Sequence, residues 1–366
     1  MAADSPQRVL MTADTVGGVW TYALELARGL TARGVELGLA TMGAPLNRAQ
    51  RRDAYSIDGL RLFESAYRLE WMDTPWHDVH RAGKWLLAIE RKYGPALVHL
   101  NSYCHGSAGF HAPVLVAGHS CVLSWWRSVR GCDAPREWNR YRRAVAKGLA
   151  AASLVVAPTR AMLDALDLHY GPLARKAVAP NGRERPLNGS VRKQAFVFTC
   201  GRVWDEAKNL RLLEAAAPDL PWPVYVAGEN RHPDGGARDC DGCRYLGRLT
   251  VRQTAWWMDR ASIYALPAKY EPFGLSALEA ALAGCALVLG DIQSLRETWG
   301  GAALFVEPDD AAGLRAAIQA LIDSPDFRID MAGRAFRRAL DFSRERMVES
   351  YLAAYRSVIE ASAGVA

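Results

Sequence analysis

Directly after the apolar segment SIYALP, the sequence reads Glu271-Pro272-Phe273-Gly274-Leu275-Ser276-Ala277-Leu278-Glu279-Ala280-Ala281. The apolar segment predicts a buried strand. Pro272 and Gly274 predict a turn into a helix, because proline is tolerated where a helix begins and glycine permits a tight turn. Free N–H groups at a helix start favour anions, so Phe273, Gly274 and Leu275 are expected to form a phosphate cradle.

Two glutamates lie eight positions apart in this stretch. Glu271 precedes the helix and can reach a sugar. Glu279 lies about five residues into the helix, roughly 7.5 Å along its axis. That distance suits a carboxylate that accepts two ribose hydroxyls while the phosphates stay at the helix start. Two surface glutamates are the alternative, but Glu279 interrupts the apolar run LSALEAALAGCALVLG, where an unpaired carboxylate is costly.

Strand-like and helix-like segments alternate along the whole chain. In the first half, apolar runs fall near residues 8–12, 37–41, 60–63, 96–100, 114–118 and 154–158. A second series starts at residue 196, after a linker around residue 181 with two Asn-Gly pairs and two prolines. The pattern predicts an α/β protein of two doubly wound, Rossmann-like domains facing across a cleft. We expect domains over 1–182 and 195–345, and an amphipathic helix over 346–366 that crosses back to the first domain.

Two further motifs follow predicted strands. Gly17 and Gly18 open the first helix, where glycines let backbone N–H groups approach a ligand closely. An ordinary tight turn is the alternative. Arg202 and Lys208 follow the strand FVFTC, and a guanidinium with an ammonium can clamp a diphosphate. The alternative for this pair is an exposed, charged helix start.

The stretch from Glu271 resembles the signature of family-4 glycosyltransferases of GT-B fold. Four further segments resemble the same family in order and spacing: GGVWTYALELARGL, GRVWDEAKNL, VAGEN and SLRETWGGAALFVEPDD. The resemblance covers nearly the whole chain. It implies a hexosyltransferase that moves a sugar from a nucleotide-diphosphate sugar, with UDP favoured, to a hydroxyl of a glycan or lipid-linked acceptor. One departure is Cys285-Ala286, where many members have a proline before the next strand.

The resemblance also implies roles for individual residues. Glu279 would hold the donor ribose, while Glu271 and the backbone of residues 273–275 would hold the transferred sugar. Arg202 and Lys208 would neutralise the diphosphate leaving group. Gly17 and Gly18 would line the donor phosphates or the acceptor. His119, in VLVAGHS, lies where the family often has a histidine beside the donor sugar; a structural histidine is the alternative.

Such enzymes retain the anomeric configuration, need no metal and carry no cofactor besides the sugar nucleotide. The resemblance implies front-face attack, in which the leaving diphosphate helps to deprotonate the acceptor. Catalysis would then come from positioning and charge stabilisation rather than from a protein nucleophile.

Charge is distributed unevenly along the chain. Residues 1–200 carry 26 Lys+Arg and 16 Asp+Glu, whereas residues 201–366 carry 19 and 23. The basic half suggests an anionic partner, and a generally arginine-rich composition is the alternative. Within it, Trp125, Trp126, Arg127 and Arg130 suit a lipid headgroup surface or an acidic glycan. A solvated, arginine-rich helix explains these four residues equally well.

The remaining features argue against other classes of protein. Cys240 and Cys243 form one CxxC without the second pair of a zinc ribbon, and Asp239-Cys240-Asp241 spells DxD away from any apolar strand, so we expect no metal. The N-terminus has no apolar signal core, and no run reaches the ~20 apolar residues of a membrane span. We expect a cytoplasmic protein, with peripheral contact at the inner face of the membrane as an extension of that prediction.

Two alternative functions stay open at this point. A GT-B-fold nucleotide-sugar 2-epimerase would need further acid/base carboxylates in the cleft, which the chain does not show clearly. A nucleic-acid-binding protein is suggested by the basic half alone, because no recognition-helix or aromatic RNA motif accompanies it.

Overall fold

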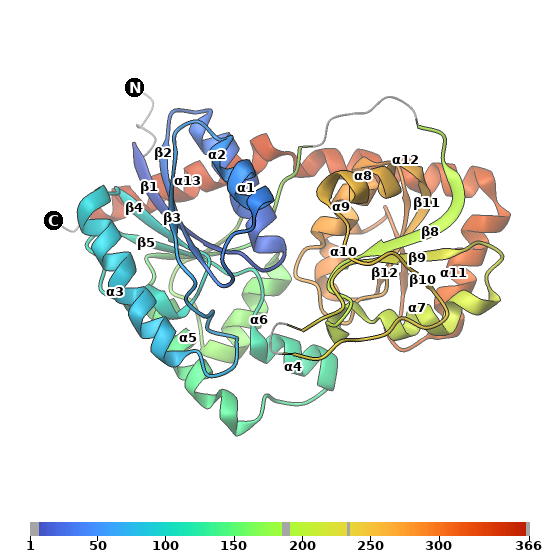
Figure 1. Ribbon diagram of the computed structural model, residues 1–366, viewed down its shortest axis with the longest axis horizontal. Helices are drawn as coiled ribbons and strands as arrows, with labels where there is room; N and C mark the ends of the chain where they lie inside the picture. The colour runs from blue at the N-terminus through green and yellow to red at the C-terminus, as the bar shows by residue number, and fades with distance from the viewer. Residues whose placement is uncertain (1–6, 185–190, 233–234, 364–366) are drawn as a thin grey trace. The chain divides into compact units, whose positions relative to one another are not determined.

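The computed structural model describes residues 7–184, 191–232 and 235–363. The chain forms two compact units, each a parallel sheet covered by helices (Figure 1). Unit 1 contains the described residues of 1–124, 133–182 and 344–366, and unit 2 contains those of 125–132 and 183–343. The predicted α/β fold with two doubly wound sheets is confirmed. Residues 185–190 of the predicted linker lie outside the described residues.

Seven parallel strands form the sheet of unit 1 in the order β3-β2-β1-β4-β5-β6-β7. Parallel neighbours need long crossover connections, which helices provide. The strands are β1 (Arg8–Asp14), β2 (Glu36–Met42), β3 (Leu60–Glu64), β4 (Leu97–Leu100), β5 (Val114–Ala117), β6 (Leu154–Ala157) and β7 (Lys176–Val178). The helices are α1 (Gly18–Thr31), α2 (Arg48–Tyr55), α3 (Trp76–Tyr93), η1 (Cys104–Ser107), α4 (Val122–Arg130), η2 (Arg136–Trp138), α5 (Asn139–Ala151), α6 (Arg160–Tyr170) and α13 (Arg344–Ala363).

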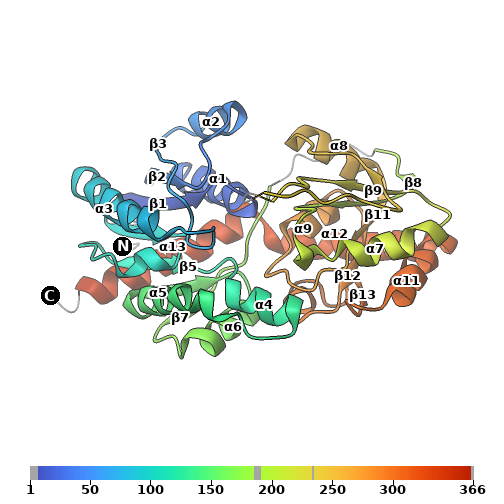
Figure 2. The ribbon, with the colours of Figure 1, turned by 60° about the horizontal axis from the view of Figure 1, so that its bottom comes forward.

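Buried aliphatic side chains fill the space between this sheet and its helices. Leu10, Val98 and Val116 on three adjacent strands pack with Leu86 of α3 and Val145 of α5. Helices α5 and α6 lie side by side, and α6 also packs on β6 and β7 (Figure 2). The central strands β4, β5 and β6 are buried completely, as expected for a parallel sheet that is covered on both faces.

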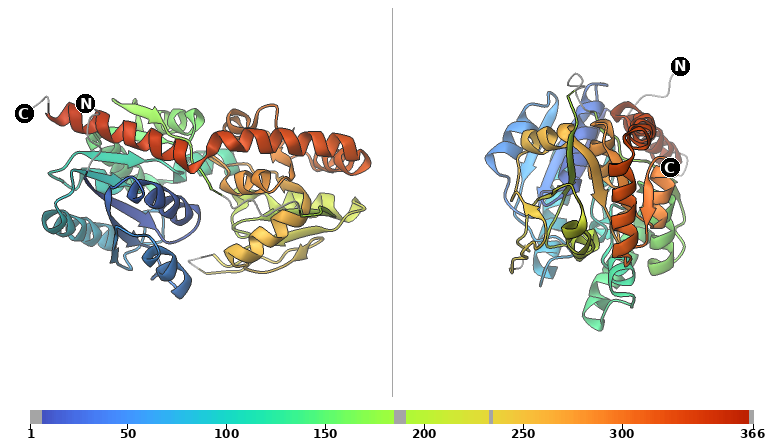
Figure 3. Two further views of the ribbon diagram at one scale, coloured as in Figure 1. Left: turned by 90° about the horizontal axis from the view of Figure 1, so that it is seen from above. Right: turned by 90° about the vertical axis from the view of Figure 1, so that its right-hand side faces the viewer.

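Helix α13 packs along α1 (Figure 3). At Gly29 the two helices are so close that a Cβ atom would lie 2.2 Å from Val348 Cγ2. Arg344 Nε donates a hydrogen bond of 2.6 Å to Glu25 Oε1 at the same interface. The C-terminal helix is thus an integral layer of unit 1.

A buried histidine lies between β4 and α13. His99 Nδ1 is 2.7 Å from the Tyr355 hydroxyl, and the imidazole stacks on Tyr351 with ring centroids 5.2 Å apart. Burial, with a smaller contribution from the neighbouring His119, lowers the pKa of His99 to about 3. The side chain is therefore a neutral hydrogen-bonding group at pH 7.

Six parallel strands form the sheet of unit 2 in the order β10-β9-β8-β11-β12-β13. They are β8 (Gln194–Cys200), β9 (Val224–Ala227), β10 (Arg244–Tyr245), β11 (Ala261–Leu266), β12 (Ala286–Gly290) and β13 (Leu304–Val306). The helices are η3 (Glu206–Lys208), α7 (Leu210–Ala216), η4 (Ala217–Asp219), α8 (Val251–Arg260), α9 (Leu275–Leu282), α10 (Gln293–Trp299), α11 (Ala311–Asp323), α12 (Pro325–Ala339) and η5 (Leu340–Phe342).

Alternate residues of these strands enter two different cores. Phe198 and Tyr264 belong to the core under α8, α9 and α10, where Trp299 is fully buried. Val197 and Ile263, one position away on the same strands, belong to the core under α7 and α11. The period of two confirms that both faces of the sheet are covered.

The residues after Ser124 depart from the domain boundaries expected from the sequence. Residues 125–132, which include the last part of α4, group with unit 2 rather than with residues 1–182. The physical reason is specific side-chain contact: Trp125 Nε1 donates to Asp205 Oδ1 at 3.0 Å, and Arg130 pairs with Glu206 at 2.6 Å. Within the described residues, no helix has both the length and the hydrophobicity to cross a bilayer.

Candidate functional site

The carboxyl ends of β8, β9, β11 and β12 converge at one edge of the unit 2 sheet. Two loops touch there: a Cβ atom at Gly228 would lie 1.7 Å from the carbonyl oxygen of Gly201. Only glycine permits this approach, which brings the loop after β8 beside the loop after β9. In open α/β sheets this edge is where ligands bind.

The loops after β8 and β11 meet through a buried ion pair. Lys208 Nζ donates to Glu271 Oε2, and both side chains are at least four-fifths buried. Ser294 Oγ donates to the backbone oxygen of Glu271 at 2.6 Å and fixes the turn. Burial by itself raises the pKa of Glu271, but Lys208 and Arg202 outweigh burial, so the net pKa is lowered and the side chain is a carboxylate at neutral pH.

Glu271 also caps the helix that follows it, which corrects the expected phosphate cradle. Gly274 N donates to Glu271 Oε1 at 3.0 Å, and Phe273 N lies 3.5 Å from the same oxygen. Gly274 is the N-cap of α9 with a φ of 89°, and it has no side chain that could cap the helix itself. The Glu271 carboxylate fills that role, so two of the three N–H groups expected to face a phosphate already have an acceptor.

Arg202 lies beside this pair and is held by an aspartate. Its Nη2 and Nε atoms lie 2.7 and 3.2 Å from Asp205 Oδ2. The other oxygen, Asp205 Oδ1, accepts from Trp125 Nε1 and from Ala207 N, both at 3.0 Å. Burial acts to raise the pKa of Asp205, but Arg202 and Lys208 lower it more, so the net shift is downward.

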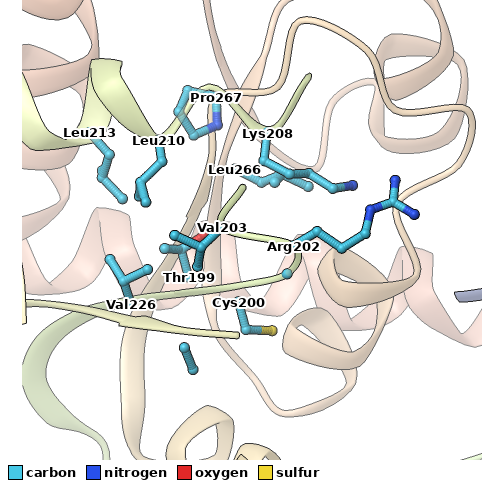
Figure 4. A pocket seen from close by; sticks show the side chains of 12 residues that line it. Thr199, Cys200, Arg202, Val203, Lys208, Leu210, Leu213, Val226, Leu266 and Pro267 are labelled. Carbon is cyan, nitrogen blue, oxygen red and sulfur yellow. The ribbon is translucent and has the colours of Figure 1, made fainter. Parts of the chain in front are cut away.

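Figure 4 shows the Arg202 and Lys208 side chains together. Their nitrogen-bearing ends extend toward the same side, away from the apolar Leu210 and Leu213 that line the inner part of the small pocket. Two cations thus share one edge of the sheet, as the sequence predicted for a diphosphate clamp. Each already has an acidic partner, Asp205 or Glu271.

Glu279 lies in the second turn of α9, on the stripe of that helix that is not fully buried. Arg183 Nε pairs with Glu279 Oε1 at 2.9 Å. Burial and, to a lesser extent, the charge of Glu279 raise the pKa of the Cys200 thiol to about 12, while the charge of Lys208 opposes the rise. The charges of Glu279 and Lys208 therefore both act on Cys200, the last residue of β8.

In unit 1, Gly17, Gly18 and His119 lie at the carboxyl ends of β1 and β5. Gly17, with a φ of 95°, is the N-cap of α1, and Gly18 is its first residue. One turn further, the ring of Tyr22 lies 4.4 Å from that of His119. The structure thus brings the start of α1 and His119 to the same sheet edge of unit 1.

The tautomer of His119 follows from its partner. Asn101 Nδ2 donates to Thr12 O at 2.6 Å, which leaves Asn101 Oδ1 as an acceptor 2.8 Å from His119 Nε2. His119 therefore donates through Nε2, and Nδ1 carries the lone pair. Burial lowers the pKa of His119 to about 4, so its imidazole is neutral at pH 7.

The basic aromatic stretch is partly engaged inside unit 2. Trp125 and Arg130 contact Asp205 and Glu206, and the Arg130 guanidinium also lies over both tryptophan rings. Arg127 is exposed. Trp125 and Arg130 thus have partners within unit 2 beside Arg202, and contact of the four residues with an acceptor or a membrane stays a prediction.

Sequence reasoning missed three residues that support the site. Asp205 carried a usable signal, since an aspartate before a short helix is a preferred N-cap. Asn101 and Arg183 carried none, because their partners Thr12, His119 and Glu279 are distant in sequence.

Cys240 and Cys243 are free, partly buried thiols, and burial raises their pKa values to about 11 and about 12. Across residues 7–184, 191–232 and 235–363, no three His, Cys, Asp or Glu side chains are grouped in a way that could hold a metal ion.

Comparisons with known proteins match both halves of the chain. Residues 16–184 match the family model Glycosyltransferase Family 4, and residues 194–324 match Glycosyl transferases group 1. The chain is 27% identical to a glycogen synthase of Mycobacterium tuberculosis, over 93% of this chain and 92% of that protein.

Solved structures share the fold at lower identity. Sucrose-phosphate synthase from Thermosynechococcus elongatus superposes with a TM-score of 0.78 at 18% identity, covering 97% of this chain and all of that one. Anabaena HepE in complex with UDP-glucose gives a TM-score of 0.72 at 16% identity, covering 96% of this chain and 99% of that one.

Proposed function

Because the chain belongs to the family-4 glycosyltransferases of GT-B fold, we propose that it transfers a hexosyl group from a nucleotide-diphosphate sugar to a hydroxyl of a glycan or lipid-linked acceptor, with retention of configuration. The donor proposal is supported by HepE, a protein of the same fold that binds UDP-glucose. A UDP-sugar is the favoured donor.

One observation carries the proposal: Arg202, Lys208, Glu271 and Glu279 gather at the carboxyl edge of one parallel sheet. Two cations are what a leaving diphosphate needs, and two carboxylates are what sugar hydroxyls need. A carboxylate has about four acceptor positions, so Glu271 can hold Lys208 and the Gly274 N–H and still accept from a sugar hydroxyl.

In the proposed reaction, the acceptor hydroxyl attacks the anomeric carbon from the face that the diphosphate leaves. The bond between that carbon and the phosphate oxygen breaks, and the hydroxyl proton passes to the departing phosphate. Arg202 and Lys208 stabilise the negative charge that develops on the diphosphate. Lys208 also orients Glu271 against the sugar, and the protein supplies no nucleophile.

The other proposed roles belong to both units. Glu279 accepts the ribose hydroxyls, and the backbone at Phe273 and Leu275 lies against the transferred sugar. The neutral His119 offers Nδ1 as an acceptor for a sugar hydroxyl. Gly17 and Gly18 leave the start of α1 open to the donor phosphates or the acceptor.

The acceptor is proposed to be anionic or anchored at a membrane surface, which agrees with the positive charge of residues 1–200. Arg127, an exposed member of the basic aromatic stretch, is available for such contact. The comparisons give no support to a 2-epimerase or to a nucleic-acid-binding protein. We also propose that the protein acts at the cytoplasmic face of a membrane and needs no metal ion.

A thermal-shift panel with UDP, GDP, ADP and dTDP tests the donor, because a ligand that binds only the folded state raises its stability. The matching nucleotide glucose is then offered with a mixture of glycan acceptors, and the anomeric signal of the product is read by NMR. We expect one nucleotide to raise the melting temperature and the product to keep the donor's configuration. No shift with any nucleotide would contradict the proposal.

A further inference from the structure

Three aromatic side chains of unit 1 gather at the end of strand β2. They come from the loop after β3 and from α3, and they are Tyr67, Trp71 and Trp85. All three are partly buried and pack against a small core that contains Met42 and Leu69. Because Met42 is the last residue of β2, this aromatic cluster lies at the carboxyl edge of the unit 1 sheet. The proposed function gives it no role so far.

The loop after β3 is fixed at this edge. Gly43 N, directly after β2, donates to Tyr67 O at 2.8 Å. The buried Glu70 carboxylate accepts from Tyr103 N at 2.9 Å and from Cys104 N at 2.8 Å, both of which follow β4. The loop therefore connects the ends of β2 and β4, which lie on either side of β1. A ligand at this edge meets rings that are held in place before it binds, which lowers the entropy cost of binding.

The polar atoms of the aromatic cluster are available to a ligand. Within residues 7–184, 191–232 and 235–363, nothing accepts from the indole N–H of Trp71 or Trp85, and the Tyr67 hydroxyl makes no hydrogen bond. None of these three atoms is a buried atom without a partner, so all three reach solvent. The cluster thus combines packed apolar rings with hydrogen-bonding groups at the surface.

Trp71 is the member of the cluster whose ring has no other ring beside it. The Tyr67 ring has the Arg81 guanidinium 5.6 Å and the Trp85 ring 5.7 Å from its centroid. In the part of the chain that the structure describes, Trp71 has neither kind of neighbour. A pyranose carries C–H groups on one face and hydroxyls around its rim. It can stack on the Trp71 indole while its hydroxyls bind the polar atoms of the cluster.

The cluster is distant from the histidine that the proposed function places beside a sugar. His119 follows β5, and β1 and β4 lie between β2 and β5 in the sheet. At ~4.8 Å per strand, the ends of β2 and β5 are about 14 Å apart. A single sugar ring does not span that distance, whereas a chain of linked sugars does.

We infer that Trp71, with Tyr67 and Trp85 beside it, is a subsite for a sugar ring of the acceptor, remote from the hydroxyl that is glycosylated. The inference rests on the proposed function, since it takes the acceptor to bind at the carboxyl edge of unit 1. It adds the class of acceptor, which is an oligosaccharide or the glycan part of a larger molecule. A monosaccharide or a lipid alcohol without a glycan does not use this subsite.

Calorimetric titration with maltoheptaose and glucose, and with α-mannoheptaose and mannose, tests this inference. We expect wild type to bind one heptasaccharide at least tenfold more tightly than its monosaccharide. Trp71→Leu keeps an apolar side chain in the cluster but removes the flat ring, and should weaken that heptasaccharide about tenfold. Trp71→Phe keeps a ring and should stay within about threefold of wild type. Equal affinity of the two variants, or no binding of either heptasaccharide by wild type, overturns the inference.

Two controls separate failure of the inference from failure of the proposed function. Trp256→Leu replaces a tryptophan of α8 in unit 2 that is 47% exposed, and it should leave heptasaccharide affinity unchanged. The thermal shift given by the preferred nucleoside diphosphate should be the same in wild type and Trp71→Leu. No shift in wild type contradicts the proposed function, whereas a normal shift with no effect of Trp71→Leu on the heptasaccharide overturns the inference alone. Should Trp71→Leu not fold, Tyr67→Leu and Tyr67→Phe replace the pair, and equal affinity of these two overturns it.

Discussion

The carboxyl edges of the two sheets carry different polar side chains. At the sheet edge of unit 1, two buried histidines are neutral: His99 and His119 have pKa values lowered by burial, and their partners are tyrosine hydroxyls and an amide. At the corresponding edge of unit 2, two ion pairs take their place: the buried pair of Lys208 with Glu271, and the partly exposed Arg202 with the buried Asp205.

We propose that this difference places the anion-binding capacity in unit 2, although residues 201–366 are the acidic half of the sequence. Net charge over a half of the chain reports on exposed residues, whereas a diphosphate responds to the few charges at the end of a sheet. Three predictions test this contrast.

Lys208→Met is expected to have the largest effect. The substitution leaves Glu271 buried without its main counter-ion, which typically costs 3–5 kcal/mol for a buried pair, so roughly the same is expected here. Turnover should fall by about a hundredfold or more, because the leaving diphosphate loses a cation. Denaturant unfolding and single-turnover kinetics measure both. Arg315→Gln, which breaks the exposed pair with Asp219, serves as the control and should change neither.

Mild acid should destabilise unit 1 before it destabilises unit 2. The pKa of His99 is about 3 when folded and near 6.5 when unfolded, so the unfolded state binds more protons between these values and stability falls as pH drops below 6.5. At pH 5 the loss is about 2 kcal/mol, from 1.36 kcal/mol per pH unit. Glu271 and Asp205, whose pKa values are lowered in the folded state, lose their contribution to stability at lower pH than His99 does. That contribution is lost only as pH falls below about 4.

Hydrogen exchange at pH 7 and pH 5 measures the protection of backbone amides in each unit separately. Peptides of β4 and α13 should lose protection before those of α9. In His99→Gln, the loss of protection in β4 and α13 between pH 7 and pH 5 should be smaller than in wild type. Simultaneous loss of protection in both units of wild type would contradict the assignment of the acid-sensitive histidines to unit 1 alone.

Trp125→Phe should have the smallest effect. It removes one donor to the charged Asp205, a contact worth about 1.5 kcal/mol. Asp205 keeps Arg202 and Ala207 N as partners, so Arg202 stays in place and turnover should change less than threefold. Trp126→Phe, whose ring packs against Trp125, is the matched control for stability. A loss of turnover as large as that of Lys208→Met would show that Trp125 does more than support Asp205.

The sequence predicted the sheets and the charged residues because both are local patterns. Apolar runs bounded by turns located most strands to within two residues, and the turn at Pro272 and Gly274 located α9. Which side chains contact one another was not predictable from the sequence. Nothing near Glu271 indicates that its carboxylate caps α9 and binds Lys208, and nothing near Trp125 indicates Asp205, 80 positions later. Such contacts depend on the packing of whole elements.

The central claim is that the edge of unit 2 holding Arg202 and Lys208 binds a nucleoside diphosphate through its phosphates. Calorimetry with UDP and UMP, and with GDP and GMP, tests it most directly. We predict that the preferred diphosphate binds at least tenfold more tightly than its monophosphate, and that Arg202→Ala narrows this gap. Equal affinity for diphosphate and monophosphate, in wild type and variant alike, would contradict the account.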